Sequence, residues 1–399
     1  MRWIIKPFIQ TVALFTLIGL KILSPIIRVE LCIVAFHRYG HLALEPEIFL
    51  GEKEIRDRTV KSKRFPIRIR WWSFGPKRLQ ANHFLVSKWR EVLCALPSWW
   101  VNALYSAGKA VRFLQLDEPK MSVRGSCNSL DLTSAHLQMT NVEIERGRAA
   151  LSELGLNPDK PYICLVVRDG GHYASLGEKE SNGYSFMNFD IANFEQASLS
   201  LVQRGYQVVR MGAGSEMAFG ANHLGIIDYA NSPKRSAFLD VFIAATCSFA
   251  VSTQTGPDAV CLAFRRPVCY IDVTRFSQFF FGTKLAWWNP VELWQGDSRL
   301  TLRDILRGPV FWIKDPNDFI REGIRQVRSS AEMIDHLVMS FVNSFESDLH
   351  QVSFEDITTR TVQKLIEDQT GTAGREQFGC IASVLNPGFV RQSGDWYLV

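Results

Sequence analysis

The sequence lacks the cysteine spacings that hold metal ions or build disulfide frameworks. Its eight cysteines are scattered along 399 residues, mostly inside apolar runs, with no CxxC pair and no Cys/His ligand spacing. Cysteines in this arrangement are typical of buried free thiols, which favours a reducing cytoplasm. The sequence therefore predicts no metal site.

Long repetitive stretches and a large excess of charge are also absent. Lys and Arg number 45 against 40 Asp and Glu, which gives a formal net charge of +5. That excess is too small for a dedicated nucleic-acid binder, and no nucleic-acid module pattern is present, so no nucleic-acid partner is expected. Hydrophobic residues make up 47% of the chain, which excludes a disordered protein, and the length suits two domains with smaller attachments.

One apolar segment near the start of the chain reads FIQTVALFTLIGLKILSPII, at residues 8–27. It is barely long enough to span a membrane, and Arg2, Lys6 and Arg28 flank it. This combination favours a helix over residues 1–28 that lies in the membrane interface, peripheral or monotopic. A single span, a cleaved signal peptide and a buried core helix are the alternatives, although no small-residue cleavage site follows the segment.

Short apolar runs alternate with helical patterns in the second half of the chain. The runs that are typical of buried strands occupy residues 162–167, 207–211, 226–227, 249–252 and 268–272. This alternation predicts a parallel, doubly wound sheet with right-handed crossovers.

The domain boundaries follow from the same patterns. A first strand-like run, VELCIVAF, begins an N-terminal α/β domain of residues 29–157, which ends at the turn-rich segment NPDKP. The C-terminal α/β domain covers residues 158–329. A long helix and an irregular tail complete the chain over residues 330–399.

The stretch FAVSTQTGPDAVCLAF, at residues 249–264, joins a strand to a helix through small hydroxylated residues and Gly-Pro. Such a junction can bind an anion, because free backbone N–H groups and the helix dipole point at the loop. The candidate residues around a bound phosphate are Ser252, Thr253, Thr255, Gly256 and Pro257. The alternative is a well-capped helix with no ligand.

The order strand, S/T-x-TGP, helix, RP, strand over residues 249–272 resembles the nucleotide-binding half of heptosyltransferase-like GT-B enzymes. Other segments are similar to a family of bacterial surface-polysaccharide glycosyltransferases: RYGHLALEPE at 38–47, VVRDGG at 166–171, GYQVVRMG at 205–212, IIDYANSPKRSAFLDVFIAATCSF at 226–249 and VSTQTGP at 251–257. The likeness covers most of residues 30–320. It implies an α/β fold of two Rossmann-like domains (GT-B), in which the N-terminal domain binds the acceptor and the C-terminal domain binds the nucleotide sugar.

When a sugar is transferred from a nucleotide sugar, the diphosphate is the leaving group. A site of this kind must therefore stabilise negative charge on the diphosphate. Three arginines are expected near strand ends or helix starts, where open α/β sheets bind ligands: Arg168, Arg210 and Arg235. A guanidinium group binds phosphate oxygens in a bidentate manner. The alternative for each arginine is a structural ion pair with one of three aspartates: Asp169, Asp228 or Asp240.

The sequence shows no DxD pair, which typically holds a metal ion in the other large glycosyltransferase architecture. We therefore expect metal-independent transfer with no cofactor beside the nucleotide-sugar substrate, in which arginines and a helix start replace the cation.

An inverting transfer also needs a base for the acceptor hydroxyl group, and GT-B enzymes usually supply it from the N-terminal domain. His41 is the first candidate, because an unperturbed imidazole titrates near neutral pH, and Glu45 is the second. Both are expected in a loop after the first strand, with Arg38 placed to orient an anionic acceptor.

These features predict a glycosyltransferase at the cytoplasmic face of the inner membrane. Its partners would be a nucleotide sugar, a lipid-linked or growing surface glycan and the membrane surface. A GT-B-fold nucleotide-sugar epimerase is one alternative, but an epimerase does not need a membrane segment. A non-catalytic scaffold of an envelope-polysaccharide complex is the other.

Overall fold

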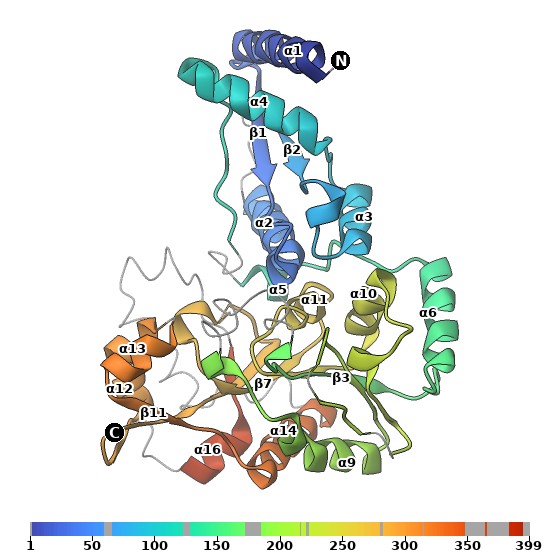
Figure 1. Ribbon diagram of the computed structural model, residues 1–399, viewed down its shortest axis with the longest axis vertical. Coiled ribbons are helices and arrows are strands. Elements are labelled where there is room, and N and C mark those ends of the chain that lie inside the picture. The colour runs from blue at the N-terminus through green and yellow to red at the C-terminus, as the bar shows by residue number, and fades with distance from the viewer. Residues whose placement is uncertain are drawn as a thin grey trace. The chain divides into compact units, whose positions relative to one another are not determined.

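The computed structural model describes residues 2–59, 66–122, 128–171, 185–215, 217–220, 223–279, 282–313, 315–347, 364 and 383–393. The chain divides into two compact units, residues 1–123 and 124–399, whose elements are labelled in Figure 1. Within the predicted tail, residues 348–363, 365–382 and 394–399 lie outside the described ranges.

The first unit is built around a short parallel sheet. Its elements are α1 (Arg2–Leu23), β1 (Ile27–Ile33), α2 (Tyr39–Thr59), β2 (Ile67–Ser73), η1 (Lys77–Leu79), α3 (His83–Val92), α4 (Ser98–Ala110) and η2 (Arg112–Leu114). β1 and β2 run parallel, and α2 connects them in sequence as a βαβ crossover. Isolated bridges from Glu30 to Asp117 and from Trp72 to Ala95 extend the sheet on each side. In its described residues this unit therefore holds two paired strands rather than the Rossmann-like sheet expected of both domains.

The helix α2 starts two residues before His41 and contains Pro46 in its interior. A proline has no N–H for the carbonyl oxygen of Leu42, four residues earlier. The indole Nε1–H of Trp89 on α3 donates to that oxygen instead, at 2.9 Å. The prediction of a loop at His41 and Glu45 was wrong, because a buried partner on another helix replaces the hydrogen bond that the proline removes.

The helix α1 packs on α4, as Figure 1 shows. Ala13 and Leu17 of α1 are buried against Ala103, Leu104 and Ala107 of α4. Small side chains at such a contact let two helix axes approach closely. Among the described residues, no helix combines the length and the apolar character that crossing a membrane requires.

The second unit contains the parallel sheet that the sequence predicted. Its seven strands follow the order β12-β8-β7-β6-β3-β4-β5, and every pair is parallel. They are β3 (Tyr162–Val166), β4 (Gln207–Arg210), β5 (Ile226–Ile227), β6 (Ala250–Ser252), β7 (Val268–Val273), β8 (Ala286–Pro290) and β12 (Val384–Leu385). The five predicted strands agree with β3 to β7 within one residue at either end, so the α/β fold with a parallel sheet is confirmed.

Helices cover both faces of this sheet (Figure 1). One face carries α9 (Glu195–Gln203), α14 (Ala331–Glu346) and α16 (Pro387–Ser393), and the other carries α6 (Asn141–Glu153), α10 (Ala237–Thr246) and α11 (Asp258–Ala263). A small antiparallel sheet has the order β10 (Ser298–Arg299), β9 (Glu292–Gln295), β11 (Ile324–Val327). The short helices are α5 (Ser129–Leu132), η3 (Ser185–Met187), η4 (Ile191–Phe194), η5 (Tyr229–Asn231), η6 (Phe276–Gln278), α12 (Leu302–Arg307), η7 (Pro309–Trp312) and α13 (Pro316–Arg321).

The helix α6 belongs to the second unit, whereas the sequence pattern placed residues 141–157 in the N-terminal domain. Gly147 of α6 lies so close to the Phe242 ring of α10 that an added Cβ would stand 2.1 Å from a ring atom. This close packing ties α6 to the large sheet. The segment NPDKP is therefore a turn inside the second unit, between α6 and β3.

Candidate functional site

The loop after β6 contains most of the candidate phosphate-binding residues. Ser252 ends the strand, and Asp258 begins α11 six residues later. The Oδ2 atom of Asp258 accepts hydrogen bonds from Ser252 Oγ at 2.6 Å and from the backbone N–H of Thr255 at 2.7 Å. The buried carboxylate therefore ties the two ends of the loop together.

Other contacts fix the middle of this loop. Gln254 has a φ of 55°, which is unusual for a residue other than glycine. Its side-chain oxygen accepts hydrogen bonds from the backbone N–H groups of Thr274 and Arg275, at 2.8 and 3.1 Å. Thr253 Oγ1 accepts one from the backbone N–H of Arg168, at 2.9 Å. Backbone strain that is held in place from both neighbouring strands is a feature of ligand sites.

The loop lies at the position where open α/β sheets bind ligands. β3 and β6 are neighbours in the middle of the sheet, and the chain proceeds from β3 to one edge and from β6 to the other. The loops after two such strands diverge, and ligands bind at this switch point. Arg168 follows β3 closely, and its Nη2 donates to the carbonyl oxygen of Gln254 at 3.2 Å. The guanidinium group of Arg168 therefore lies against the loop.

The candidate residues in this loop differ in exposure. Ser252 and Thr253 are buried, and their hydroxyl groups hold Asp258 and the backbone of Arg168. Thr255, Gly256 and Pro257 are partly exposed. We conclude that the first two residues brace the loop, while the later three lie where a ligand can reach them.

Burial raises the pKa of the Asp258 carboxyl group from 3.8 to about 6, because its charged form is poorly solvated there. The hydrogen bonds from Ser252 and Thr255 and the positive charge of Arg168 lower this pKa without cancelling the effect of burial. Asp258 therefore changes its charge close to neutral pH, in the centre of the candidate site.

Replacing Asp258 by asparagine should remove a pH dependence of stability. Between about pH 4 and pH 6 the unfolded chain has lost a proton that the folded protein still holds, so wild-type stability falls as the pH rises. The full effect, present above the folded-state pKa, is on the order of 3 kcal/mol. Asparagine keeps an oxygen that accepts from Ser252 and Thr255 but does not titrate.

Thermal denaturation over this pH range checks the expectation. The Tm of the wild type should fall relative to that of Asp258→Asn as the pH rises. Asp297→Asn, which changes an exposed carboxylate in the turn between β9 and β10, is the control and should follow the wild type. Parallel profiles for the wild type and Asp258→Asn would show that Asp258 does not have the raised pKa.

Arg210 lies at the end of β4, where its side chain is 1% exposed. Its Nη2 atom is 3.1 Å from Asp169 Oδ2, and its Nη1 atom is 3.4 Å from Asp228 Oδ2. These are two of the aspartate partners that the ion-pair alternative named. Arg210 therefore links the segments that follow β3 and β5 and holds Asp169, the neighbour of Arg168.

Arg235 precedes α10 and also has an aspartate partner. Its Nη2 atom is 3.5 Å from Asp240 Oδ2, and its guanidinium group lies over the Tyr229 ring, 5.9 Å from the centroid. Burial raises the pKa of Asp240, and the positive charge of Arg235 acts against this rise. Of the three candidate arginines, Arg168 is the one whose side chain has a contact with the loop after β6 among the interactions described.

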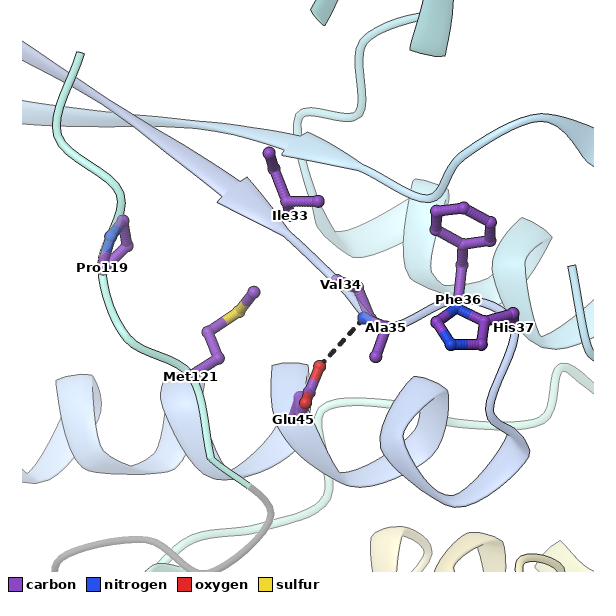
Figure 2. A pocket seen from close by; sticks show the side chains of 8 residues that line it. All are labelled: Ile33, Val34, Ala35, Phe36, His37, Glu45, Pro119 and Met121. Atoms are coloured by element: carbon purple, nitrogen blue, oxygen red, sulfur yellow. Dashed lines mark hydrogen bonds between the residues drawn. The ribbon is translucent and has the colours of Figure 1, made fainter. Parts of the chain in front are cut away.

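In the first unit, His41 and Glu45 form a hydrogen-bonded pair. They lie one turn apart on α2, with His41 Nδ1 at 2.8 Å from Glu45 Oε1. The other carboxylate oxygen of Glu45 accepts the backbone N–H of Ala35 at 3.1 Å, as Figure 2 shows. A carboxylate can only accept from Nδ1, which leaves the proton on Nδ1 and a lone pair on Nε2. This is the arrangement that a general base requires.

A hollow of about 350 Å³ lies beside Glu45, where β1 ends (Figure 2). Most of its lining is apolar, and the polar side chains are the His37 ring and the Glu45 carboxylate. The residues that line it are Ile33, Val34, Ala35, Phe36, His37, Glu45, Pro119 and Met121. Its volume is near the lower end of the range for small-molecule sites. Arg38 is exposed and directly precedes α2.

Sequence reasoning did not identify Asp258 and Gln254 as parts of the site. A signal for Asp258 was present, because T-x-x-D at 255–258 matches a capping box, in which an acidic side chain binds the N–H of the capping residue. The role of Gln254 depends on a positive φ and on hydrogen bonds from the two residues that follow β7, and no local sequence pattern predicts either feature. The His37 ring also lines the hollow in the first unit.

One group of potential metal ligands comes together in the described part of the chain. The thiols of Cys164, Cys247 and Cys261 are buried within 4.8 Å of one another. The Sγ atoms of Cys164 and Cys247 donate to the carbonyl oxygens of Ile243 and Ala244, at 3.5 and 3.3 Å. All three thiols are fully buried among the apolar side chains of the second unit's core.

Comparisons with known proteins find likenesses among solved structures only. No protein-family model and no curated protein matches the chain. It is similar to ADP-heptose lipopolysaccharide heptosyltransferase II of E. coli, with a TM-score of 0.41 and 14% identity over 67% of this chain and 92% of that chain. It is also similar to a glycosyltransferase of family 9 from Veillonella parvula, with a TM-score of 0.37 and 9% identity over 62% of this chain and 81% of that one.

A third similar structure is the E. coli heptosyltransferase WaaC with ADP, with a TM-score of 0.31 and 13% identity over 62% of this chain and 89% of that chain. Two of these solved structures are heptosyltransferases, and one is a glycosyltransferase of family 9. Their TM-scores and identities mark a partial likeness, and a shared fold does not fix a function. A function has to be argued from the residues of the site.

Proposed function

We propose that the protein is a metal-independent, inverting glycosyltransferase of the GT-B type. It moves a sugar from a nucleotide-sugar donor to a lipid-linked or growing surface glycan and needs no cofactor. The observation that carries this proposal is the braced loop of residues 252–258, with Arg168 against it, at the switch point of a parallel sheet.

The proposed donor site holds the diphosphate of the nucleotide sugar. The hydroxyl group of Thr255 and the backbone at Gly256 would meet the phosphate oxygens, and Pro257 directly precedes the helix α11. Arg168 supplies the positive charge that stabilises the leaving diphosphate. Arg210 and Arg235 act indirectly, because their aspartate partners keep the surrounding segments in place.

The proposed base is His41. Its Nε2 atom takes the proton from the acceptor hydroxyl group while the hydroxyl oxygen forms a bond to the anomeric carbon. The bond from that carbon to the diphosphate breaks, and the diphosphate leaves with the electron pair. Glu45 accepts the Nδ1–H of His41 and stabilises the imidazolium ion that forms. This proton transfer needs neither a metal ion nor a redox group.

The hollow beside Glu45 is the proposed binding site of the acceptor. Its apolar walls suit the face of a sugar ring, while the His37 ring and the Glu45 carboxylate offer polar contacts. Arg38 is exposed next to these residues in sequence and would meet an anionic group of the acceptor. We place the enzyme at the cytoplasmic face of the inner membrane, because α1 is apolar and has cationic neighbours.

A thermal-shift panel with UDP, GDP, CMP, dTDP and ADP tests the donor site. We expect one nucleotide to raise the Tm, because a ligand that binds the folded protein stabilises it. Arg168→Ala or Thr255→Ala should weaken that binding about ten- to a hundred-fold, since each removes a hydrogen bond to a charged group. Arg303→Ala, an exposed arginine on α12, is the control and should bind like the wild type.

The outcomes separate the proposed function from its alternatives. Binding of none of the nucleotides would contradict the proposal and favour a scaffold protein. Conversion of a nucleotide sugar to its epimer in the absence of an acceptor would identify an epimerase. Equal binding by the wild type and by both variants would place the nucleotide elsewhere on the protein.

A further inference from the structure

The helix α1 is apolar on the side that faces away from α4 as well as on the side that packs against it. Ala13 and Leu17 are buried on α4. On the opposite side, Phe8 and Phe15 are 68% exposed and Ile22 is 73% exposed. A helix at the surface of a globular protein normally places polar residues outward. Three large exposed apolar side chains on one face of a helix therefore indicate a surface that is covered by something else.

The exposed apolar surface continues beyond α1. Phe113 of η2 is 72% exposed, and the Nζ atom of Lys21 lies 4.3 Å from the centroid of its ring. The end of α1 and the segment after α4 are therefore neighbours. We call the exposed side chains of Phe8, Phe15, Ile22 and Phe113 the apolar platform.

The segments that carry the apolar platform contain charged residues of one sign only, and Asp117, which follows the second segment, forms an ion pair with Arg28. Residues 2–29 and 97–116 contain no Asp or Glu at all. Their charged residues are cationic without exception: Arg2, Lys6, Lys21, Arg28, Lys109 and Arg112. An apolar surface with a cationic border is complementary to a bilayer that contains anionic lipids, where the acyl region takes the apolar groups and the phosphates take the cations.

We propose that the apolar platform inserts into the interface of an anionic bilayer, so that α1 lies parallel to the membrane plane with α4 packed on its inner side. Phe8, Phe15 and Ile22 enter the acyl boundary. Lys21 and Arg112 stay at the level of the lipid phosphates, with long side chains that reach outward from the apolar region. The inference deepens the proposed function, since a lipid-linked acceptor is presented at the same surface.

The geometry favours a bilayer over a second copy of the chain as the occupant. In a symmetric dimer the same surface would meet itself, and the cations at its border would face cations of the other copy. Anionic lipids remove that repulsion, whereas a second copy adds to it. The oligomeric state of the protein in solution therefore discriminates between the two occupants.

Co-sedimentation with lipid vesicles tests the proposal on the full-length protein. Vesicles of phosphatidylcholine with about one third phosphatidylglycerol should bind the wild type at least about ten-fold more tightly than vesicles of phosphatidylcholine alone, because cations near an anionic surface add to apolar insertion. The double substitution Phe15→Glu, Ile22→Glu should abolish binding to both kinds of vesicle. Lys21→Gln with Arg112→Gln should weaken binding to the anionic vesicles alone.

Ile320→Glu provides the matched control. Ile320 is 77% exposed in the second unit, so this variant replaces an equally exposed isoleucine outside the apolar platform. It should bind vesicles like the wild type. Unchanged vesicle binding by the Phe15→Glu, Ile22→Glu variant would overturn the proposal. So would a wild-type dimer, detected by light scattering, that the same double substitution dissociates.

The same variants separate this inference from the proposed function. Phe15→Glu with Ile22→Glu should leave the nucleotide-induced rise in Tm unchanged, because neither side chain belongs to the second unit. That result also shows that the variant is folded. If the wild type binds vesicles through the apolar platform but binds no nucleotide, this inference is supported and the proposed function is refuted.

Discussion

Replacing His41 by alanine should lower the rate of sugar transfer about a hundred- to ten-thousand-fold, the range in which a general base contributes to catalysis. Nucleotide binding should not change, because His41 belongs to the first unit and the donor loop to the second. The loss is expected in kcat, since the imidazole takes its proton only as the acceptor oxygen attacks. Steady-state kinetics with the nucleotide sugar identified by the binding panel measures the effect.

Glu45→Gln tests the pairing on α2 without removing much volume. A carboxamide can direct its N–H toward Nδ1 of His41, which places the imidazole proton on Nε2 and leaves no base there. The rate should therefore fall nearly as far as in His41→Ala. His83→Ala is the control, because His83 is an exposed histidine of the same unit, at the start of α3, and does not line the hollow. If His41→Ala and Glu45→Gln both left transfer intact, the proposed base would be wrong.

Arg210→Ala should destabilise the second unit by about 3–5 kcal/mol, which is the usual effect of removing one partner of a buried ion pair. The substitution leaves Asp169 and Asp228 largely buried and without the guanidinium group that they share. Denaturant unfolding, followed by tryptophan fluorescence, should show a large decrease in the midpoint. Arg210→Lys should recover part of the loss, because one ammonium group cannot reach two carboxylates in the same geometry.

Arg235→Ala is the matched control for this prediction. Arg235 has a single, longer contact with Asp240, and its side chain is 29% exposed. Its removal should cost no more than about 1 kcal/mol. Similar losses for the two variants would show that the double ion pair of Arg210 does not stabilise the fold more than an ordinary surface pair.

The strands of the large sheet were predictable because each is a short apolar run between polar segments. Val208 and Val251, for example, are fully or almost fully buried, and both lie in runs that can form buried strands. The loop after β6 was predictable for a related reason, since Gly-Pro after hydroxylated residues marks the start of a helix. Local composition was sufficient in both cases.

The sequence was insufficient where a distant residue decides the outcome. In the sequence, Pro46 indicates the end of a helix. In the structure the helix continues, because Trp89 donates a hydrogen bond to the carbonyl oxygen of Leu42. Arg210 has the same appearance in the sequence as Arg168, but it is a buried partner of two aspartates. Each of these contacts joins residues that are far apart in the chain, and a local pattern contains no record of them.

In the proposed membrane orientation, the length of β1 would set the distance between the proposed base and the lipid surface. This strand follows α1 directly and has seven residues, and the pair of His41 and Glu45 lies at its far end through Ala35. Seven residues at about 3.3 Å each span about 20 Å. An α1 that lies in the bilayer would therefore hold the imidazole about 20 Å from the acyl region. The length of β1 would then select the acceptor by its size. Glycans long enough to extend past the headgroups would reach the base, and shorter lipid-linked sugars would not.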